Sequence, residues 1–480
     1  MTGSSILIAT LVVYIIGLLA LGILAERRTK NAADFFLGGR RLGPLVAAVG
    51  ASASSSSAWT LLGVSGAAYA WGLSALWLFP ACVGGFLINW FIIAPAVNAA
   101  GHRQGAMTLI DLLAGERGAR AFKGIAALVV LVSMSAYIAS QFQGAGKTFH
   151  AVFDVAPAHA VLVGAAIILV YMFLGGFIAV SLTDMVQGLV MAATALLLPI
   201  AALVEVGGPT GLIDGLGQVS SAGYLELGGP RPVPLAIGFV AGLLGIGLGY
   251  PGQPHVAKYF LAMEANPDTV RRARRLAIAW SVLIYAGMLL VGLCGRVILA
   301  ELGDRETVFL ALAEHLFHPV VAGIMLAAVL SAMMSTADSQ LLVVAATFIH
   351  DLGLGGRHPL RRTRLVVVLT TAAATVAALV GSQEIFSRVL FGWSAMGAAF
   401  GPPLVVGVVF ARSMSARLLW VTALVGALLA VFGHALYEPL LGTRDYQGVF
   451  RHVVPYVAAF AVAWLGSRRA DPHEGQEPDT

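Results

Sequence analysis

The chain has 480 residues, of which 59% are hydrophobic and only 11% are charged. Soluble proteins usually carry about 25% charged residues, so this chain has too little polar surface for a soluble enzyme or a nucleic-acid-binding protein. A helix needs about 20 apolar residues to cross a bilayer, and the composition therefore predicts a membrane protein with many spans. The net charge of +5 is better explained by membrane orientation than by an acidic partner.

Apolar runs bounded by charged or turn residues predict thirteen transmembrane helices. In chain order the predicted spans are 5–25, 43–71, 73–98, 124–146, 160–178, 183–205, 233–250, 276–299, 319–347, 364–381, 387–411, 416–438 and 451–467. The first run is longer than the core of a signal peptide and has no basic residue before it, so we expect an uncleaved span with its amino end outside. The polar tail 468–480 is expected to be disordered and cytoplasmic.

The distribution of basic residues supports this topology. With the amino terminus outside, the predicted cytoplasmic loops contain most of the 29 lysines and arginines, as the positive-inside rule requires. The loop after the seventh span alone contains Lys258, Arg271, Arg272, Arg274 and Arg275. The asymmetry favours thirteen spans and a cytoplasmic carboxyl terminus.

The second predicted span contains an unusual run of serines between Ser52 and Ser57. Their hydroxyls could bond back to carbonyls of their own helix, which a membrane helix tolerates. Alternatively, the helix unwinds here and its freed carbonyls line a cavity, where irregular backbone can persist inside a bilayer. The serine run taken alone leaves both alternatives open.

The ninth predicted span carries polar residues on one face. Ala332, Ser335, Thr336 and Ser339 recur at i, i+3, i+4 and i+7, which places them on one side of a helix. Carbonyls from an unwound helix and two hydroxyls from this face would supply the oxygen ligands that a sodium ion needs. A packing face of small residues would explain the serines but not Asp338, because an acidic residue inside a span is costly and indicates function.

Six short stretches resemble motifs of the sodium:solute symporter family, and its sodium/proline symporter branch most closely. In chain order they are Phe36-Leu37-Gly38-Gly39-Arg40, Gly175-Gly176-Phe177, Thr183-Asp184-Met185-Val186-Gln187, Gly247-Leu248-Gly249-Tyr250-Pro251-Gly252-Gln253-Pro254-His255, Met334-Ser335-Thr336 and Gly397-Ala398-Ala399-Phe400-Gly401-Pro402. Each motif is weak alone, but the ordered set is specific.

The resemblance implies an all-α polytopic membrane protein with a LeuT-type five-plus-five inverted repeat. The single transporter domain would span 1–467, with the two repeats at 43–205 and 233–411. A span at 5–25 and the spans within 416–467 would be additions to this core.

The same resemblance implies a sodium site between the broken first core helix and the eighth core helix. Carried over residue by residue, Ala53, Ser56 and Ala332 would offer backbone carbonyls. Ser335 and Thr336 would offer their hydroxyls.

One departure from the proline branch concerns the charge of this region. That branch has an aspartate where Ser55 stands and an uncharged residue where Asp338 stands, so we expect the negative charge to lie on the opposite wall of the cavity. Relatives that transport two sodium ions suggest a second site made by Ser335, Asp338, Ser339 and Asp184. The alternative for Asp184 is that it caps the start of its helix.

Substrate-binding residues are also implied by the resemblance. They are Ser57, Trp59, Tyr137, Ile246 and Tyr250, although the proline branch has a tryptophan at position 246 and a glycine where Ala58 stands. A helix break would aim backbone N–H groups at a substrate carboxylate. Proline or a related amino acid is the first expectation, and another small carboxylate or a sugar acid is the alternative.

We therefore expect a sodium-coupled symporter that imports a small solute across the plasma membrane by alternating access. Its expected partners are the substrate, sodium and the lipid bilayer, without a nucleic acid, an obligate protein partner or a cofactor other than the coupling ion. Cys82 and Cys294 lie in apolar runs without CxxC spacing, so neither a disulfide framework nor a zinc site is expected.

Three other classes remain as alternatives. Proton coupling is physically possible because of Asp338, and a membrane sensor would need a separate output partner. An intramembrane enzyme would need Asp184 and Asp338 as an acid/base pair, but no nucleophile or metal motif accompanies them.

Overall fold

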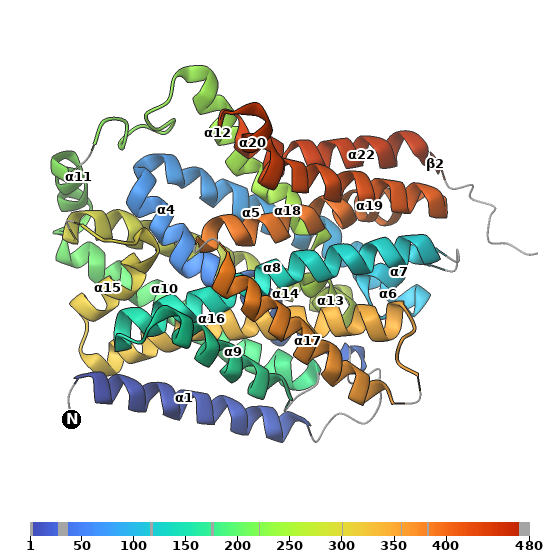
Figure 1. Ribbon diagram of the computed structural model, residues 1–480, viewed down its shortest axis with the longest axis horizontal. Helices are drawn as coiled ribbons and strands as arrows, with labels where there is room; N and C mark the ends of the chain where they lie inside the picture. The colour runs from blue at the N-terminus through green and yellow to red at the C-terminus, as the bar shows by residue number, and fades with distance from the viewer. Residues whose placement is uncertain are drawn as a thin grey trace, which may run out of the picture.

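The computed structural model describes residues 3–26, 37–115, 119–173, 177–219, 221–299, 301–356, 358–381 and 384–469. The predicted disorder of the tail beyond Arg469, the glycines Gly175 and Gly176 and the start of the first motif at Phe36 lie outside these ranges. The described chain forms a bundle of helices that run roughly along one axis (Figure 1).

The helices follow one another with short connections. In chain order they are α1 (Gly3–Glu26), α3 (Pro44–Ser55), α4 (Val64–Trp71), α5 (Leu78–Ile88), α6 (Ala94–Gln104), α7 (Leu109–Ala114), α8 (Arg120–Phe153), α9 (Pro157–Phe173), α10 (Phe177–Glu205), α11 (Gly208–Val219), α12 (Val233–Gly245), α13 (Pro254–Ala262), α14 (Pro267–Ile298), α15 (Val308–Leu316), α16 (Pro319–Ala346), α17 (Pro359–Val380), α18 (Ile385–Leu404), α19 (Ala416–Val431), α20 (Tyr437–Leu441), α21 (Gln447–His452) and α22 (Val454–Gly466). The described strands, β1 (Arg412–Ser413) and β2 (Arg468–Arg469), pair antiparallel.

Length and composition identify the helices that belong in a membrane. Within the described residues, nine helical stretches are long and apolar enough to cross a bilayer, and shorter apolar helices lie at Ile6–Leu21, Pro44–Ser55, Pro157–Val170 and Val454–Gly466. The most apolar window is 83% buried in the stretch of α16 and 89% buried in that of α18, but only 33% buried in α17 and in α19. Helices α16 and α18 are therefore central, whereas α17 and α19 present apolar surface outward.

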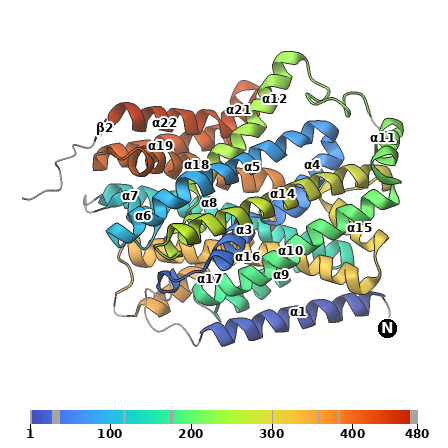
Figure 2. The same ribbon diagram turned by 180° about the vertical axis from the view of Figure 1, so that it is seen from behind.

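The ends of the chain flank this centre. Helix α1 lies along one edge of the bundle and the pair α19 and α22 lies along the opposite edge, in both views (Figures 1 and 2). The amino end of α1 and strand β2 lie at opposite ends of the bundle (Figure 1). Helix α1 packs on α16, where the Tyr14 hydroxyl hydrogen-bonds the Ser331 hydroxyl.

Two breaks interrupt helices in the middle of the bundle. The first falls between α3 and α4, where Ser56 has extended angles of φ −112° and ψ 91°. The second falls at Gln253 (φ −93°, ψ 104°), between a 3-10 segment, Ile246–Gly252, and α13. Glycines and a proline precede the second break, and proline at the start of α13 suits a helix that begins there.

The second break corrects one prediction. The predicted span 233–250 ends where the chain in fact unwinds and continues into α13, whose residues are all buried. Lys258, expected in a basic loop with Arg271 and its neighbours, belongs to α13 and has only 7% of its surface exposed. The arginines at 271–275 lie instead in the first turns of α14.

Candidate functional site

The end of α3 is built as the unwinding alternative predicts. The Ser55 hydroxyl does bond back to the Ser52 carbonyl at 2.9 Å, but the helix stops there and Ser56 is extended. The last carbonyls of a helix have no partner within it and carry partial negative charge. The hydroxyls of Ser52, Ser54 and Ser56 are buried without a hydrogen-bond partner among the described residues, so this end of α3 is a polar, oxygen-rich site inside an apolar bundle.

The polar face of α16 meets this end of α3. The two helices lie side by side at the centre of the bundle (Figure 2), and the Thr336 hydroxyl donates to the Ser54 carbonyl at 3.3 Å. The Ser335 hydroxyl is fully buried and has no hydrogen-bond partner within the described chain. The hydroxyl of Thr336 therefore contacts the carbonyl of Ser54 and not that of Ala53, which was the predicted ligand. The Ala53 carbonyl instead accepts the backbone N–H of Ser56 at 3.1 Å.

Helix α10 covers the same region from a third side. An added Cβ at Gly188 of α10 would lie 3.1 Å from the Cβ of Ala53, so glycine permits the close approach of the two helices. Ala332, Ser335, Thr336 and Ala53 are all fully buried. The structure therefore brings the predicted sodium ligands of α3 and α16 into one buried region.

Asp184 lies within α10, seven residues after its first residue, Phe177, so it does not cap the start of that helix. Its carboxylate accepts hydrogen bonds from the Tyr259 hydroxyl and, at 3.3 Å, from the Ser339 hydroxyl. Its other oxygen, Oδ1, is buried without a partner in the described structure. The alternative that Asp184 is only a helix cap is wrong.

Asp338 lies on α16 beside this cluster. It is fully buried, and neither carboxylate oxygen has a hydrogen-bond partner among the described residues. The charged groups that act on Asp338 are Asp184 and Lys258. Three predicted residues of the possible second site, Asp184, Asp338 and Ser339, are therefore gathered in one place.

Lys258 is the charged residue of this cluster that the sequence analysis missed. Its Nζ atom donates to the Ser339 hydroxyl at 2.9 Å. The same atom lies 5.2 Å from the ring centre of Phe177 and 5.1 Å from that of Tyr259, within the range of cation–π interactions. A lone lysine among the apolar residues of 254–262 differs from the dense basic run at 271–275, and this difference could have identified it.

An aromatic cluster lies at the break of α3 and α4. Tyr137 of α8 donates to the Ser57 hydroxyl at 3.3 Å. The ring of Tyr250 packs edge-on against that of Trp393, with centroids 4.6 Å apart, and its hydroxyl hydrogen-bonds that of Tyr285 at 3.0 Å. These side chains and Trp59 are buried, so four predicted substrate residues, Ser57, Trp59, Tyr137 and Tyr250, lie in or beside one aromatic cluster.

Trp393 of α18 lies beside Ile246, the fifth predicted substrate residue. Its indole N–H donates to the backbone carbonyl of Ile246 at 3.1 Å. An indole is thus present beside position 246, but it comes from α18. Ile246 contributes its backbone oxygen to this contact, in a 3-10 segment that is itself buried.

Other polar groups of the cluster were not predicted. The ring of His255 packs edge-on against those of Tyr137 and Trp393, with centroids 6.1 Å and 6.3 Å apart. Neither ring nitrogen of His255, the indole N–H of Trp59 nor Oε1 of Gln253 has a hydrogen-bond partner in the described chain. Because buried polar groups are normally paired, these are groups that a bound solute can satisfy.

The backbone N–H groups after the first break are engaged by the protein itself. The amide N–H of Ala58 donates to the Gln141 side-chain oxygen at 3.1 Å. Those of Trp59 and Thr60 donate to the hydroxyl and the carbonyl of Ser57, at 3.1 Å and 2.9 Å. The N–H groups that were expected to bind a substrate carboxylate are therefore already hydrogen-bonded to other groups of the protein in this structure.

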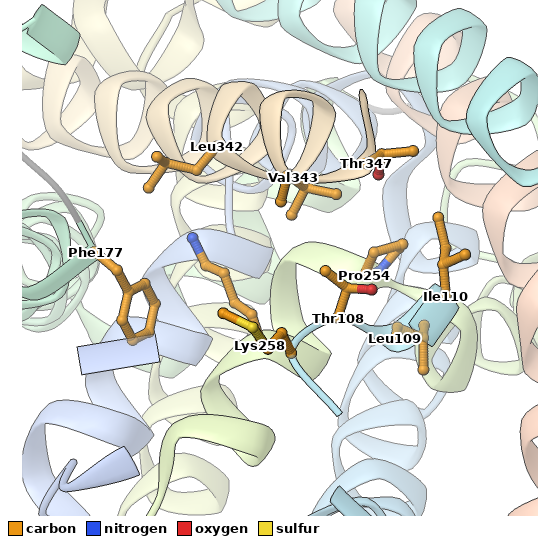
Figure 3. Close-up of a pocket in the computed structure, with 11 residues that line it drawn as sticks. Thr108, Leu109, Ile110, Phe177, Pro254, Lys258, Leu342, Val343 and Thr347 are labelled. Carbon is orange, nitrogen blue, oxygen red and sulfur yellow. The ribbon is translucent and has the colours of Figure 1, made fainter. Parts of the chain in front are cut away.

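Two cavities flank the aromatic cluster. We call the first the α7 cavity; it is lined by Met107, Thr108, Leu109, Ile110, Phe177, Pro254, Lys258, Leu342, Val343, Ala346 and Thr347 (Figure 3). The second, the α12 cavity, is the wider of the two, and its lining includes Trp71, Phe239 and Phe386. Phe386 also contacts Trp59, with ring centroids 5.5 Å apart, and Pro254 precedes His255, so each cavity has one lining residue next to the cluster.

Ion pairs stabilise the wall of the α12 cavity. Arg305 and Glu384, which line it, form a salt bridge. Next to them Glu306, only 2% exposed, pairs with Lys147 at 2.5 Å and accepts the backbone N–H groups that begin α18. These contacts tie α8, α18 and the segment before α15 together at this end.

The chain is similar in sequence to a known family and to several known proteins. The model of the sodium:solute symporter family matches residues 35–426. The sodium/proline symporter of Escherichia coli (strain K12) is 34% identical over 432 residues, which cover 85% of this chain and 84% of that protein. The high-affinity proline transporter PutP of Bacillus subtilis (strain 168) is 32% identical over 412 residues, covering 82% and 85%.

A solved structure has a similar fold. It is that of a Na⁺-coupled sialic acid symporter in a substrate-bound outward-open state. The TM-score is 0.76 at 16% sequence identity, and the match covers 97% of this chain and 99% of that one. At this identity the likeness concerns the fold alone.

Proposed function

The chain belongs to the sodium:solute symporter family, and from this premise we propose that the solute it imports with sodium is proline or a closely related amino acid. It is a multi-pass protein of the plasma membrane and a transporter, and sodium is its coupling ion. Proline is supported by the sodium/proline symporters to which the chain is similar. A cluster of buried aromatic rings with a few unpaired polar groups also suits a small solute with an apolar body.

We propose a topology of thirteen spans with the amino terminus outside and the carboxyl terminus cytoplasmic. The opposite positions of the first helix and strand β2 support an odd number of spans (Figure 1). Two inverted repeats, at 43–205 and 233–411, would each begin with a helix broken in the middle, and the breaks at Ser56 and Gln253 fit this arrangement. Helix α1 and the helices within 416–467 would lie outside the repeats.

The sodium ion would bind where α3 ends against α16. We propose carbonyl ligands from Ala53, Ser56 and Ala332 and hydroxyl ligands from Ser335 and Thr336. The single observation that carries this site is the contact between the Thr336 hydroxyl and the Ser54 carbonyl, because it joins the broken end of one helix to the polar face of the other. The partial negative charge at the end of α3 favours a cation there.

We propose a second cation position in the cluster of Asp184, Asp338 and Ser339. Three carboxylate oxygens of this cluster have no hydrogen-bond partner among the described residues. Two buried carboxylates in an apolar bundle need positive charge nearby, because an unpaired buried charge is costly.

Alternating access would use the two cavities in turn. Sodium would join α3 to α16 and order the break beside it, which holds Ser57 and Trp59 of the substrate site. Solute bound against Tyr137, Tyr250 and Trp59 would then exchange between the α12 cavity and the α7 cavity as the bundle rocks. Because binding of the two ligands is linked, each must raise the affinity for the other by the same factor.

Purified protein in proteoliposomes tests this function. Uptake of radiolabelled proline is measured under an inward sodium gradient, under a proton gradient without sodium, and with unlabelled amino acids, small carboxylates or sialic acid as competitors. We expect uptake of labelled proline to be driven by the sodium gradient and to be reduced by unlabelled proline. We also expect the affinity for proline to rise with the sodium concentration. Uptake that follows the proton gradient alone, or an affinity that is flat across sodium concentrations, contradicts sodium coupling; competition by a carboxylate but not by proline contradicts the substrate.

A further inference from the structure

Asp111, His350 and Asp351 lie together beside α7, apart from the proposed sodium and solute sites. Each offers one ligand atom, an imidazole nitrogen or a carboxylate oxygen, and these atoms all lie within 4.8 Å of one another. Asp111 belongs to α7, whereas His350 and Asp351 belong to the π-helical turn Thr347–Asp351 that follows α16. Because Asp111 and His350 are 239 positions apart in the chain, only the folded bundle brings the three side chains together.

The carboxyl group of Asp351 is incompletely satisfied inside this cluster. Only 5% of the surface of Asp351 is exposed. One of its oxygens, Oδ1, accepts a hydrogen bond from the Thr108 hydroxyl at 2.7 Å, but Oδ2 is buried without a hydrogen-bond partner among the described residues. Since buried polar groups are normally paired, a carboxyl group that faces two other ligand side chains with a free oxygen is suited to a bound cation.

The separation of His350 from Asp111 fits a shared metal ion better than a direct ion pair. Nε2 of His350 and Oδ2 of Asp111 are 3.4 Å apart, which exceeds the roughly 2.7–2.9 Å of a charge-assisted hydrogen bond. Two ligands that each lie about 2.0–2.1 Å from a tetrahedral zinc ion are about 3.3–3.4 Å from each other. Small side-chain rotations would therefore bring all three ligand atoms of the cluster onto one ion.

Neighbouring groups hold the two carboxylates in place. The Thr108 hydroxyl, which donates to Asp351, also accepts the backbone N–H of Asp111 at 2.9 Å. The backbone N–H of Met107 donates to Oδ2 of Asp111 at 3.1 Å. Lys123 is a nearby cation, but its Nζ atom lies 3.8 Å from the other oxygen of Asp111, beyond hydrogen-bond distance. Such outer contacts orient the ligands of metal sites.

We infer that Asp111, His350 and Asp351 form a binding site for a divalent transition-metal ion of the zinc class, with a fourth position left for water. One imidazole nitrogen and two carboxylate oxygens suit zinc, whereas magnesium and calcium favour oxygen ligands alone. The side chains of His350 and Asp111 are 33% and 26% exposed, so the ion can enter from water. Metal ligands must be deprotonated, so binding would displace the protons that the cluster otherwise holds.

An ion bound here would join α7 to the end of α16. Thr108, just before α7, and Thr347, at the start of the π-helical turn, both line the α7 cavity (Figure 3). The ion would therefore hold two walls of this cavity together. Binding at this site goes beyond the proposed transport function and depends on neither the solute nor sodium.

Titration of the full-length protein with zinc tests the site. Wild type, His350→Gln and Asp351→Asn are purified in detergent without a histidine tag and freed of metal with EDTA, which is then removed. We expect the wild type to bind one Zn²⁺ by isothermal titration, and Co²⁺ to give the intense visible absorption of a tetrahedral complex. Both variants should bind Zn²⁺ at least about tenfold more weakly and lose the Co²⁺ signal.

Thermal unfolding gives an independent readout, since an ion that binds only the folded state raises the Tm. Zn²⁺ should raise the Tm of the wild type and leave that of His350→Gln unchanged. His358→Gln is the matched control, because His358 is an exposed histidine at the start of α17, outside the cluster. It should bind Zn²⁺ and respond to it as the wild type does.

Three results overturn the inference. One is a wild type that binds no Zn²⁺ at a ratio of one per protein. Another is a His350→Gln protein with unchanged affinity and Tm response, which would place the zinc elsewhere. The third is displacement of Zn²⁺ by an equal concentration of Mg²⁺, which would contradict the class of ion. His350 is partly exposed, so His350→Gln decides the question even if the buried Asp351→Asn does not fold.

Discussion

The hydroxyl of Thr336 lies 3.3 Å from the backbone carbonyl oxygen of Ser54 and donates a hydrogen bond to it. The two residues are 282 positions apart in the chain, and the bond joins the broken end of α3 to the polar face of α16. A sodium ion bound here would accept electron pairs from oxygens of these two helices. The Thr336 hydroxyl would then turn its hydrogen away from Ser54 and its oxygen toward the ion.

Replacing this hydroxyl should weaken sodium binding. We expect Thr336→Val, which keeps the shape of the side chain, to raise the sodium concentration for half-maximal proline uptake about 10- to 100-fold. This corresponds to the roughly 1.5–3 kcal/mol of an interaction between a polar group and a charge. Ser335→Ala should act in the same direction, since its buried hydroxyl has no hydrogen-bond partner in the described chain.

Thr422→Val is the matched control for this measurement. Thr422 lies on α19, outside the proposed repeats, and its buried hydroxyl also has no hydrogen-bond partner among the described residues. Its sodium dependence should equal that of the wild type. Equal sodium dependence for Thr336→Val would place the ion elsewhere.

The charge of the Asp184–Asp338 cluster should control sodium affinity. We expect Asp338→Asn to weaken sodium binding at least about tenfold, because unit charges a few ångströms apart inside a protein interact by roughly 1–4 kcal/mol. The double variant Asp338→Asn/Lys258→Gln restores one net negative charge and should recover part of the lost affinity. Isothermal titration with sodium or ²²Na⁺ binding gives both values.

Without recovery in the double variant, net charge would not explain the effect of Asp338→Asn. If Asp338→Asn itself leaves sodium affinity and coupling unchanged, Asp338 does not replace the aspartate that the proline branch has where Ser55 stands. A Lys258→Arg/Asp338→Asn protein serves as the control that keeps both the substitution and the positive charge.

Removing the Tyr137 hydroxyl should affect the solute and not the ion. Tyr137→Phe loses the hydrogen bond to Ser57, and we expect the KM for proline to rise about 2- to 10-fold, as for a neutral hydrogen bond of roughly 0.5–1.5 kcal/mol. The sodium dependence at saturating proline should stay as in the wild type. Uptake kinetics at several sodium concentrations separate the two effects.

Tyr437→Phe is the control for Tyr137→Phe. It also removes a hydroxyl that donates a hydrogen bond, to the Asp445 carbonyl, but it lies on α20, away from the aromatic cluster. An unchanged KM for Tyr137→Phe, or an equal change in both proteins, would remove Tyr137 from the substrate site.

The contact between α7 and the π-helical turn Thr347–Asp351 after α16 should depend on pH in the acid range. A hydrogen bond with His350, and after it the backbone N–H of Met107 and the charge of Lys123, hold the pKa of Asp111 below its ordinary value. A carboxyl whose folded pKa is lowered adds stability above its unfolded pKa and loses it as pH falls through the folded one. Asp111→Asn should therefore lower the Tm at neutral pH, and its difference from the wild type should begin to shrink below about pH 4 and decline further as pH falls through the lower folded pKa of Asp111.

Thermal unfolding of both proteins in detergent between neutral pH and about pH 3 measures this difference. Asp268→Asn, which removes an exposed acid paired with Arg271 at the start of α14, is the control for loss of a surface carboxylate. A difference between Asp111→Asn and the wild type that stays constant down to pH 3 would contradict the role of the Asp111 charge.

Local features of the sequence were sufficient for much of the fold. Hydropathy predicted apolar helices along the chain, and the serine run between Ser52 and Ser57 indicated a break as one of two alternatives, which the structure then places after Ser55. The spacing of Ala332, Ser335, Thr336 and Ser339 determined that they share one helix face, and the structure turns this face toward α3 and α10. Family motifs then named the same region as a sodium site.

Contacts between distant helices needed the tertiary structure. Trp393 supplies the indole beside Ile246, 147 positions away. The side-chain oxygen of Gln141 on α8 accepts a hydrogen bond from the backbone N–H of Ala58. Neither partner carries a local signal, because the side chain that faces a given position across a bundle depends on how the helices pack.

Lys258 is the clearest example of a residue whose position the sequence predicts wrongly and the tertiary structure decides. By its charge alone a lysine after an apolar run belongs in a cytoplasmic loop, because burying an isolated ammonium costs too much free energy. Packing of α10 and α16 against α13 brings two carboxylates and the Ser339 hydroxyl to it and offsets this cost. The sequence by itself determined that the chain is a bundle of membrane helices with a polar break, and only the tertiary structure decided which charges lie together inside it.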